Sequence, residues 1–324
     1  MGATDTTPSR ERTGLTPRPP YPRLIEAFWL TAFFPIAQLA VANLGGGLLF
    51  VLALLATLLG PPTATSRIAD TGSALLRHPA IVAAFSVIAC WVIMLYVLQK
   101  TRMSFWKLFP LRPVRLALWP PVVLTMLGAL IVLVEVDNLV SMVLPPPAWF
   151  HELFADLLGG SSLWGALLAV VIVAPLTEEL LFRGVILRGL LLRHSARKAI
   201  IASSLLFGFV HLNPWQLVGA TVLGVLFAWW YVHTRSLTLC IFGHAFNNLV
   251  PVLLLNVGDW ERASAVANPL DSPELLPMWL VAVGILLAVG GLWLTHRQFA
   301  EQWALSHPPS GERQQLYQER HDER

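Results

Sequence analysis

Long apolar stretches run through most of this sequence, and several reach the length of a bilayer-spanning helix. About 20 consecutive apolar residues in an α-helix cross the hydrocarbon core of a membrane. Eight such segments cover residues 27–59, 80–99, 117–144, 163–187, 199–212, 215–233, 237–257 and 276–295. Charged residues make up only 13% of the chain, whereas soluble domains have about a quarter, which argues against a large soluble core. The sequence therefore predicts an all-α polytopic membrane protein with about eight transmembrane helices in the lipid bilayer.

Two of these segments depart from a simple span. The first is long and contains Gly45-Gly46-Gly47, so we expect it to be tilted, kinked or partly re-entrant. The fifth, residues 199–212, is too short to cross alone unless its helix extends back through Ser195 to Lys198. Short helices are tolerated at membrane depth where neighbouring protein buries them.

The distribution of Lys and Arg predicts how the chain is oriented. With eight crossings and both termini in the cytoplasm, eighteen of the 22 Lys and Arg residues fall on the cytoplasmic side. Only Arg67, Arg77 and Arg262 fall on the opposite side, and Arg183 lies within a span. This bias follows the positive-inside rule. We therefore expect polar cytoplasmic tails at residues 1–23 and 297–324.

The wider composition narrows the class of protein further. The net charge of +3 reflects this topology and does not indicate a nucleic-acid partner. The two cysteines, Cys90 and Cys240, both lie in apolar runs, which suggests neither a disulfide framework nor a cysteine-based metal site. A chain rich in Leu, Ala and Arg without long extensions favours a prokaryotic plasma membrane.

The loop from Lys100 to Arg115 (KTRMSFWKLFPLRPVR) mixes basic residues with Trp and Phe. Such a segment can lie on the membrane surface as an amphipathic element. The simpler interpretation is a basic cytoplasmic loop with aromatic residues at the interface.

Ionisable residues inside apolar spans are costly, and they indicate functional sites. The fourth span, VIVAPLTEELLFRGVILRGLL, contains Glu178, Glu179 and Arg183. Glu179 and Arg183 are four residues apart and share one helix face, in the favourable order of acid before base. Glu178 points about 100° away, so one carboxylate is left free when the other pairs with the arginine. The plain structural alternative is a Glu–Arg pair that holds two helices together.

Two further segments carry polar residues at the same spacing. In SSLLFGFVHLNPWQ, Phe207 and His211 are four apart, so the ring can pack beside the imidazole. In SLTLCIFGHAFNNLVPVLL, His244 and Asn248 are four apart, and Gly243 permits close backbone approach. Taken alone, each histidine has an ordinary explanation, as an interfacial residue or as hydrogen-bonding contact between helices.

Together, these side chains are the parts that a peptidase without a Ser or Cys nucleophile requires. A glutamate and a neutral histidine can polarise water for amide hydrolysis. A second histidine and an asparagine amide can supply donors to the developing oxyanion. The competing use is a divalent metal such as zinc, with Glu178, His211 and His244 as candidate ligands. No His-Glu-x-x-His motif is present, and the sequence leaves metal dependence open.

The ordered set Glu178-Glu179-x-x-x-Arg183, Phe207-x-x-x-His211 and His244-x-x-x-Asn248 resembles the CPBP family, the type II CAAX-prenyl-endopeptidase-like (Abi) membrane proteases. The resemblance covers roughly residues 160 to 257. It implies an intramembrane catalytic cavity and a catalytic core over 161–257. The flanking parts are then N-terminal transmembrane helices over 24–160, and a loop with the last transmembrane helix over 258–296.

The resemblance also implies roles. Glu178 is expected to activate water with His211 as its partner, and His244 and Asn248 to stabilise the oxyanion. Glu179 and Arg183 are expected to support the site, their pairing holding Glu178 in place, and Phe207 to pack beside His211. The substrate is then a membrane-associated protein or peptide. The family is described both as metal-dependent and as glutamate-type.

Two other functions fit parts of the pattern. Several members of the resembling family are associated with bacteriocin self-immunity, so a non-catalytic membrane partner or scaffold is the main alternative. A small-solute transporter is disfavoured because the sequence has no internal repeat and no paired broken helices.

Overall fold

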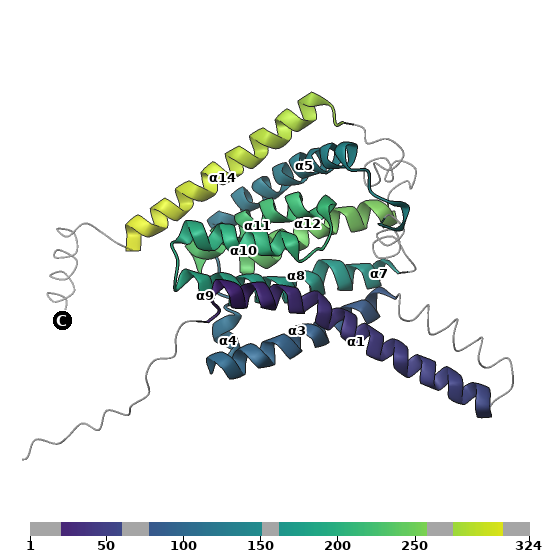
Figure 1. The fold of residues 1–324 in the computed structure, drawn as a ribbon. Coiled ribbons are helices and arrows are strands. Elements are labelled where there is room, and N and C mark those ends of the chain that lie inside the picture. Colours follow the sequence, from purple (N-terminus) through teal and green to yellow (C-terminus); the bar gives the residue numbers. More distant parts are fainter. Residues whose placement is uncertain (1–20, 60–77, 151–161, 258–274, 307–324) are drawn as a thin grey trace, which may run out of the picture.

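The computed structural model describes residues 21–59, 78–150, 162–257 and 275–306. Within these ranges the chain is helical and has no β-strand (Figure 1). Its longer helices are α1 (Leu24–Leu59), α3 (Pro79–Thr101), α5 (Trp119–Val143), α10 (Ala196–Phe209), α11 (Pro214–Thr234), α12 (Thr238–Val257) and α14 (Met278–Ser306). The short helices α4 (Phe105–Leu108) and η1 (Leu116–Leu118) lie between α3 and α5.

The fourth predicted span is one continuous helical rod made of consecutive segments. These are α7 (Leu163–Ala166), η2 (Leu167–Val173), α8 (Ala174–Glu179), η3 (Leu180–Leu187) and α9 (Arg188–Leu191). The segments η2 and η3 are π-helical, with a wider turn than an α-helix. Short π-helical stretches inside helices are frequently found at functional sites.

Seven helices in the described residues are long and apolar enough to cross a membrane. They coincide with seven of the eight predicted spans, so the all-helical polytopic fold is confirmed. The eighth predicted span is α10, which begins at Ala196 but has only 14 residues. At 1.5 Å per residue it is about 21 Å long, which is shorter than the hydrocarbon core.

Although short, α10 connects the two ends of the helical bundle. Helix α9, which comes just before α10, begins with Arg188. The Nη1 atom of Arg188 donates to the carbonyl of Lys107, a residue of the segment that leads into the start of α5. Its following helix α11 begins beside the other end of α5, where Trp215 Nε1 donates to the carbonyl of Leu144 at 2.7 Å. Therefore α10 runs from one end of the bundle to the other, as an eighth crossing would.

The turn after α10 explains why this helix stops where it does. Leu212 has a left-handed backbone with φ of 55°, which ends the helical path. Asn213 then caps α11 by accepting a hydrogen bond from the Gln216 amide at 2.8 Å, and Pro214 occupies the first turn. The local sequence therefore fixes a tight turn immediately after His211.

The first helix runs through Gly45-Gly46-Gly47 without a break. A re-entrant turn at these glycines, one of the expected alternatives, is therefore wrong. With 36 residues α1 is about 54 Å long, so it must tilt in the membrane or project beyond it.

Small residues allow the closest helix contacts. Helices α5 and α14 lie side by side (Figure 1), and a Cβ atom on Gly128 would collide with the backbone of Ala288 and Gly284. Close packing at small residues is a usual way for transmembrane helices to associate, because lipid offers no hydrophobic drive between them.

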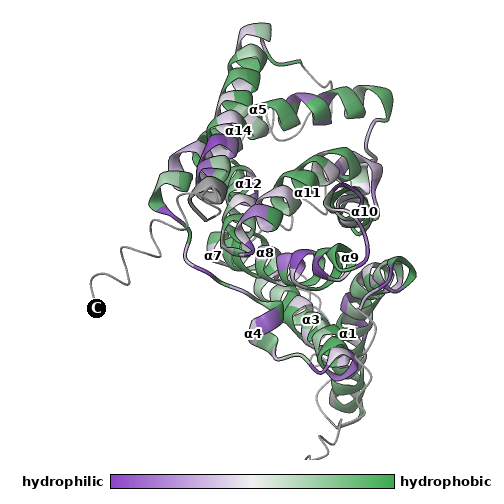
Figure 2. Ribbon diagram, turned by 90° about the vertical axis from the view of Figure 1, so that its left-hand side faces the viewer, coloured by the Kyte–Doolittle hydropathy of each residue, from purple (hydrophilic) through white to green (hydrophobic). Residues whose placement is uncertain are grey.

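The polar and apolar residues separate along the bundle (Figure 2). Apolar residues dominate the long helices, whereas hydrophilic residues are prominent around α4 and on the α8–α9 part of the fourth span. Many large apolar side chains are exposed on the outer helices, as expected for a surface that faces lipid. The expected outer arginines Arg67, Arg77 and Arg262, and most of both predicted tails, lie outside the described residues.

Candidate active site

The two glutamates lie near the middle of the Leu163–Leu191 span, at the end of α8. Glu179 and Arg183 form the predicted i, i+4 pair, with Arg183 Nη1 2.9 Å from Glu179 Oε1. Both residues are buried, Glu179 at 0% and Arg183 at 1% exposure. A carboxylate and a guanidinium at this depth need each other, since an unpaired charge there is strongly unfavourable. The predicted pairing is confirmed.

Arg183 is held by three further groups. Its Nη2 donates to the Gly224 carbonyl of α11 at 3.2 Å. Its guanidinium carbon lies 4.3 Å from the centre of the Phe207 ring and 5.4 Å from that of Phe227. Aromatic faces stabilise a cation in an apolar setting. The arginine therefore joins the fourth span to α10 and α11.

Glu179 also contacts the seventh predicted span. His244 Nδ1 lies 2.9 Å from Glu179 Oε1, the same oxygen that binds Arg183. Because a carboxylate paired with arginine accepts hydrogen bonds, His244 carries a proton on Nδ1 and directs Nε2 away from Glu179. Glu179 therefore orients His244, a connection that spacing within one helix did not predict.

Glu178 lies on the other side of the same imidazole. Its Oε2 is 3.9 Å from His244 Nε2, too far for a direct hydrogen bond. Among the described residues Oε2 has no hydrogen-bond partner, although this atom is buried. The Glu178 side chain keeps 18% of its surface exposed, whereas that of Glu179 has none. Oε2 of Glu179 also lacks a hydrogen-bond partner among the described residues, but its Oε1 binds both Arg183 and His244. The two neighbouring carboxylates thus differ in that only Glu179 is anchored through one of its oxygens.

His211 follows α10 and is fixed by its own turn. Its Nδ1 lies 2.9 Å from the Phe207 carbonyl, and since a carbonyl only accepts, Nδ1 carries the proton. Its own carbonyl accepts from Asn213 Nδ2 at 2.9 Å. The Phe207 ring packs edge-on against His211, with ring centres 5.4 Å apart, as predicted. A neutral His211 therefore presents an unprotonated Nε2.

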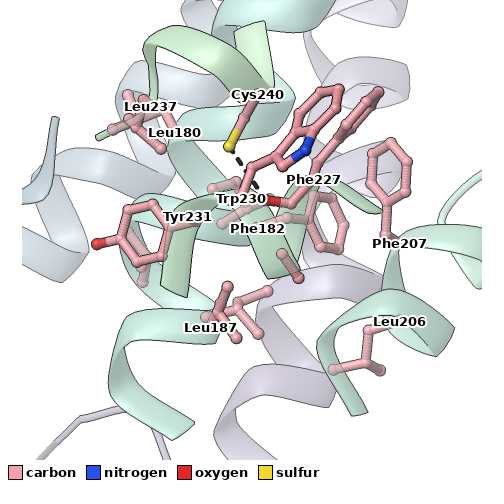
Figure 3. Close-up of a cluster of buried hydrophobic side chains, with 14 of the residues drawn as sticks. Leu180, Phe182, Leu187, Leu206, Phe207, Phe227, Trp230, Tyr231, Leu237 and Cys240 are labelled. Atoms are coloured by element: carbon pink, nitrogen blue, oxygen red, sulfur yellow. Dashed lines mark hydrogen bonds between the residues drawn. The ribbon is translucent and has the colours of Figure 1, made fainter. Parts of the chain in front are cut away.

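Aromatic rings enclose the polar groups. Phe207 meets His244 edge-on at 5.6 Å, and Phe227 stacks on His244 at 5.9 Å. Both rings belong to the buried apolar cluster that also contains Trp230 (Figure 3). A Cβ atom on Gly243 would lie 2.7 Å from Trp230 and 2.8 Å from Phe227, which confirms that this glycine permits close approach. The cluster therefore fixes the plane of the His244 ring.

Asn248 fills a gap in the hydrogen bonds of the fourth span. In π-helix η2 each amide bonds to the carbonyl five residues earlier, as Ala174 does to Ala169. The next donor in that series is residue 175, which is a proline and has no N–H. Asn248 Nδ2 takes its place and donates to the Val170 carbonyl at 2.9 Å.

The structure thus brings Glu178, Glu179, Arg183, Phe207 and His244 into one cluster. His211 joins it through the Phe207 ring, and among the described residues it forms no ion pair or hydrogen bond with Glu178. We expected the Glu179–Arg183 pair to hold Glu178, but the hydrogen bond that Glu179 makes beyond this pair is to His244.

The three candidate metal ligands do not all come together. Within the described parts of the chain, no three His, Cys, Asp or Glu side chains lie close enough to hold a metal ion. The set of Glu178, His211 and His244 therefore does not fit zinc, which requires at least three protein ligands around one point.

Three contributors to the site were not anticipated: the Val170 and Gly224 carbonyls and the Phe227 ring. Pro175 was a usable signal for the first, since a proline within a buried helix leaves a carbonyl that needs another donor. The other two have no signal in the local sequence, because they depend on how α11 packs against its neighbours.

Comparisons with known proteins match the part of the chain that contains these residues. Residues 160–250 match the family described as type II CAAX prenyl endopeptidase, Rce1-like. The chain is also 34% identical over 83 residues to the protein named "Putative membrane peptidase YdiL" of Bacillus subtilis (strain 168), a match that covers 26% of this chain and 34% of that protein. It thus spans about a third of that relative's length. No solved structure matches the chain significantly. Residues 160–250 of this multi-pass membrane protein are therefore similar to the Rce1-like type II CAAX prenyl endopeptidase (CPBP) family.

Proposed function

We propose that this protein is an intramembrane endopeptidase that hydrolyses a peptide bond in a membrane-associated protein or peptide. The observation that carries the proposal is the asymmetry of the two adjacent glutamates. Oε2 is buried without a hydrogen-bond partner among the described residues in both glutamates, but Glu179 Oε1 binds Arg183 and His244. Glu178 has no such anchor among the described residues, and its Oε2 lies 3.9 Å from His244 Nε2, the nitrogen that points away from Glu179. A site that needs only structural pairing has no use for the second carboxylate.

In the proposed reaction, Glu178 is the general base. It takes a proton from water, and the resulting hydroxide attacks the carbonyl carbon of the scissile peptide bond. The protonated Glu178 then gives its proton to the leaving amine. His211, whose Nε2 is available to accept a hydrogen bond, is proposed to orient this water.

His244 and Asn248 are proposed to stabilise the oxyanion. When protonated at Nε2, His244 can donate there, and its Nδ1 contact with Glu179 holds the ring in this orientation. Asn248 uses Nδ2 to hold Val170, and the second N–H of that amide remains to donate. Donors placed in a buried site stabilise developing charge strongly, because they need no rearrangement as the charge forms.

The direct test compares protein termini in cells that express the wild-type chain or the Glu178→Gln variant at equal levels. Mass spectrometry of membrane-protein termini should reveal new ends only with the wild type, and these ends identify the substrate. Glu301→Gln is the matched control, since this exposed glutamate on α14 lies outside the site. It should give the wild-type pattern.

The same comparison separates catalysis from a non-catalytic partner function. If Glu178→Gln leaves both the termini and the cellular phenotype unchanged, the endopeptidase proposal fails and a binding function takes its place. Purified protein in detergent, incubated with the candidate substrate, then establishes whether cleavage is direct.

A further inference from the structure

A pocket of about 420 Å³ lies beside α4 and the loop that follows it. The basic side chains in its lining are Lys107, Arg112 and Arg188, and no acidic residue is among the described residues that line it. Three cations around one pocket make it attractive to an anionic group. This pocket is separate from the glutamate–histidine cluster and has no part in the proposed hydrolysis.

Apolar side chains accompany the cations. Trp106 also lines the pocket and is 74% exposed, and Leu111 beside it is 54% exposed. Leu116, a few residues further on, is 84% exposed. Tryptophan is enriched at the boundary between lipid tails and headgroups, where its ring meets apolar carbon and its N–H meets polar atoms. The pocket therefore combines positive charge with apolar surface in a chain that spans a membrane.

One wall of the pocket is attached to the helix that carries His244. The Leu237 amide donates to the Pro110 carbonyl at 2.9 Å. Ser236 Oγ donates to the Arg112 carbonyl at 2.9 Å and accepts from the Arg112 amide at 3.0 Å. These bonds fix the Pro110–Arg112 backbone against the start of α12 without using the Arg112 guanidinium.

The other wall is attached to the helix that carries the glutamates. Arg188 Nη1 donates to the Lys107 carbonyl at 2.7 Å. A Cβ atom on Gly184 would collide with the Leu108 carbonyl, so α4 rests directly on η3. The pocket thus lies where the ends of both site-bearing helices meet, and its shape is formed by backbone contacts.

We propose that this pocket binds the phosphate of an anionic membrane phospholipid. The phosphate lies among Lys107, Arg112 and Arg188, and the glycerol and first acyl carbons lie against Trp106 and Leu111. Basic pockets between membrane helices bind anionic headgroups in this manner. The exposed apolar residues beside the cations favour a lipid over free phosphate, which has no apolar part to bury.

The test uses the purified full chain in a neutral detergent, with short-chain phosphatidylglycerol as the probe. Saturable binding, followed by the rise in melting temperature, is expected for the wild type and not with short-chain phosphatidylcholine. The Lys107→Gln/Arg112→Gln variant should weaken binding about 25-fold, since each basic residue near an anionic lipid contributes about five-fold. Only the carbonyls and amides of these two residues have hydrogen bonds in the structure, so the variant should fold.

The matched control is Arg197→Gln/Lys198→Gln, which removes the same two charges from exposed positions on α10 outside the pocket. It should bind phosphatidylglycerol as the wild type does. Equal weakening in both double variants, or none in the pocket variant, would overturn the proposal. Inorganic phosphate that gives the same shift at the same concentration would also overturn it, because the lipid part would then contribute nothing.

Discussion

Glu179 Oε1 accepts hydrogen bonds from Arg183 and from His244, each at 2.9 Å. One buried oxygen thus fixes both the arginine that reaches α11 and the histidine on α12. Glu178, one residue earlier, has no such contacts. The two carboxylates are therefore expected to respond differently to the same substitution.

Glu179→Gln should destabilise the protein. The amide keeps the size of the side chain but removes the negative charge, which leaves the Arg183 guanidinium buried without its counter-ion. Removal of one member of a buried ion pair costs about 3–5 kcal/mol in free energy of unfolding. Thermal unfolding in detergent measures this loss. A melting temperature equal to that of the Glu301→Gln control would mean that Arg183 does not depend on Glu179.

Glu178→Gln should leave stability nearly unchanged and reduce hydrolysis. Its Oε2 has no hydrogen-bond partner among the described residues, so folding loses little when the carboxylate becomes an amide. Loss of a general base lowers the rate by about 10²–10⁴-fold. The turnover number of the purified variant on an identified substrate tests this prediction. Full activity at normal stability would remove Glu178 from the mechanism.

At the scale of helices, the fourth span and α12 are joined where the backbone of the former is incomplete. Pro175 leaves the Val170 carbonyl without a main-chain donor, and Asn248 supplies one from α12. The π-helical path and the inter-helix hydrogen bond therefore depend on each other.

A double-mutant cycle tests this dependence. Asn248→Ala should cost about 1–3 kcal/mol, because it leaves a carbonyl unsatisfied at membrane depth. Pro175→Ala supplies a backbone N–H at the position from which the π-helical bond is missing. In that background Asn248→Ala should therefore cost clearly less. Additive losses, measured by unfolding in detergent, would show that the two positions are independent.

The contact between α5 and α14 offers a second test at this scale. Gly291 and Gly290 are neighbours on α14, but a Cβ on Gly291 would collide with Thr125 of α5, whereas one on Gly290 meets nothing within 4 Å. Gly291→Ala should destabilise by about 1–3 kcal/mol through overpacking. Gly290→Ala should be neutral or stabilising by about 0.5–1 kcal/mol, as alanine is the better helix residue. The difference in melting temperature between these variants checks the packing, and equal values would contradict it.

At the scale of the whole molecule, α10 determines at which end of the bundle the later helices begin. Seven long spans alone would place the start of α1 and the end of α14 at opposite ends of the bundle. Helix α10 adds an eighth passage from one end of the bundle to the other. The start of α1 and the end of α14 then lie at the same end of the bundle (Figure 1), as the expected cytoplasmic location of both tails requires. The Leu276 amide donates to Glu135 at 2.9 Å, which places the start of α14 near the end of α5 opposite to Arg197.

Cysteine labelling tests this topology. Both native cysteines are buried, so the wild type should not react with a membrane-impermeant maleimide. Met278→Cys, at an 87% exposed position, should react in intact cells, whereas Arg197→Cys should react only after permeabilisation. Labelling of both variants in intact cells, or the opposite order, would contradict the proposed orientation.

The sequence by itself determined the features that depend on local geometry. Apolar length predicted the helical spans, and i, i+4 spacing predicted the Glu179–Arg183 pair and the packing of Phe207 on His211. These follow because the rise and turn of a helix fix the relation of residues that are close in the chain.

Only the tertiary structure decided how the helices face one another. It joined Glu179 to His244 across 65 residues, gave Asn248 the Val170 carbonyl, and placed Phe227 on the His244 ring. Among the described residues it gave His211 no hydrogen bond or ion pair with Glu178, against the simplest expectation from the motifs. The physical reason is that the rotation and depth of each helix are set by packing between helices, through residues such as Gly243 that carry no chemistry of their own.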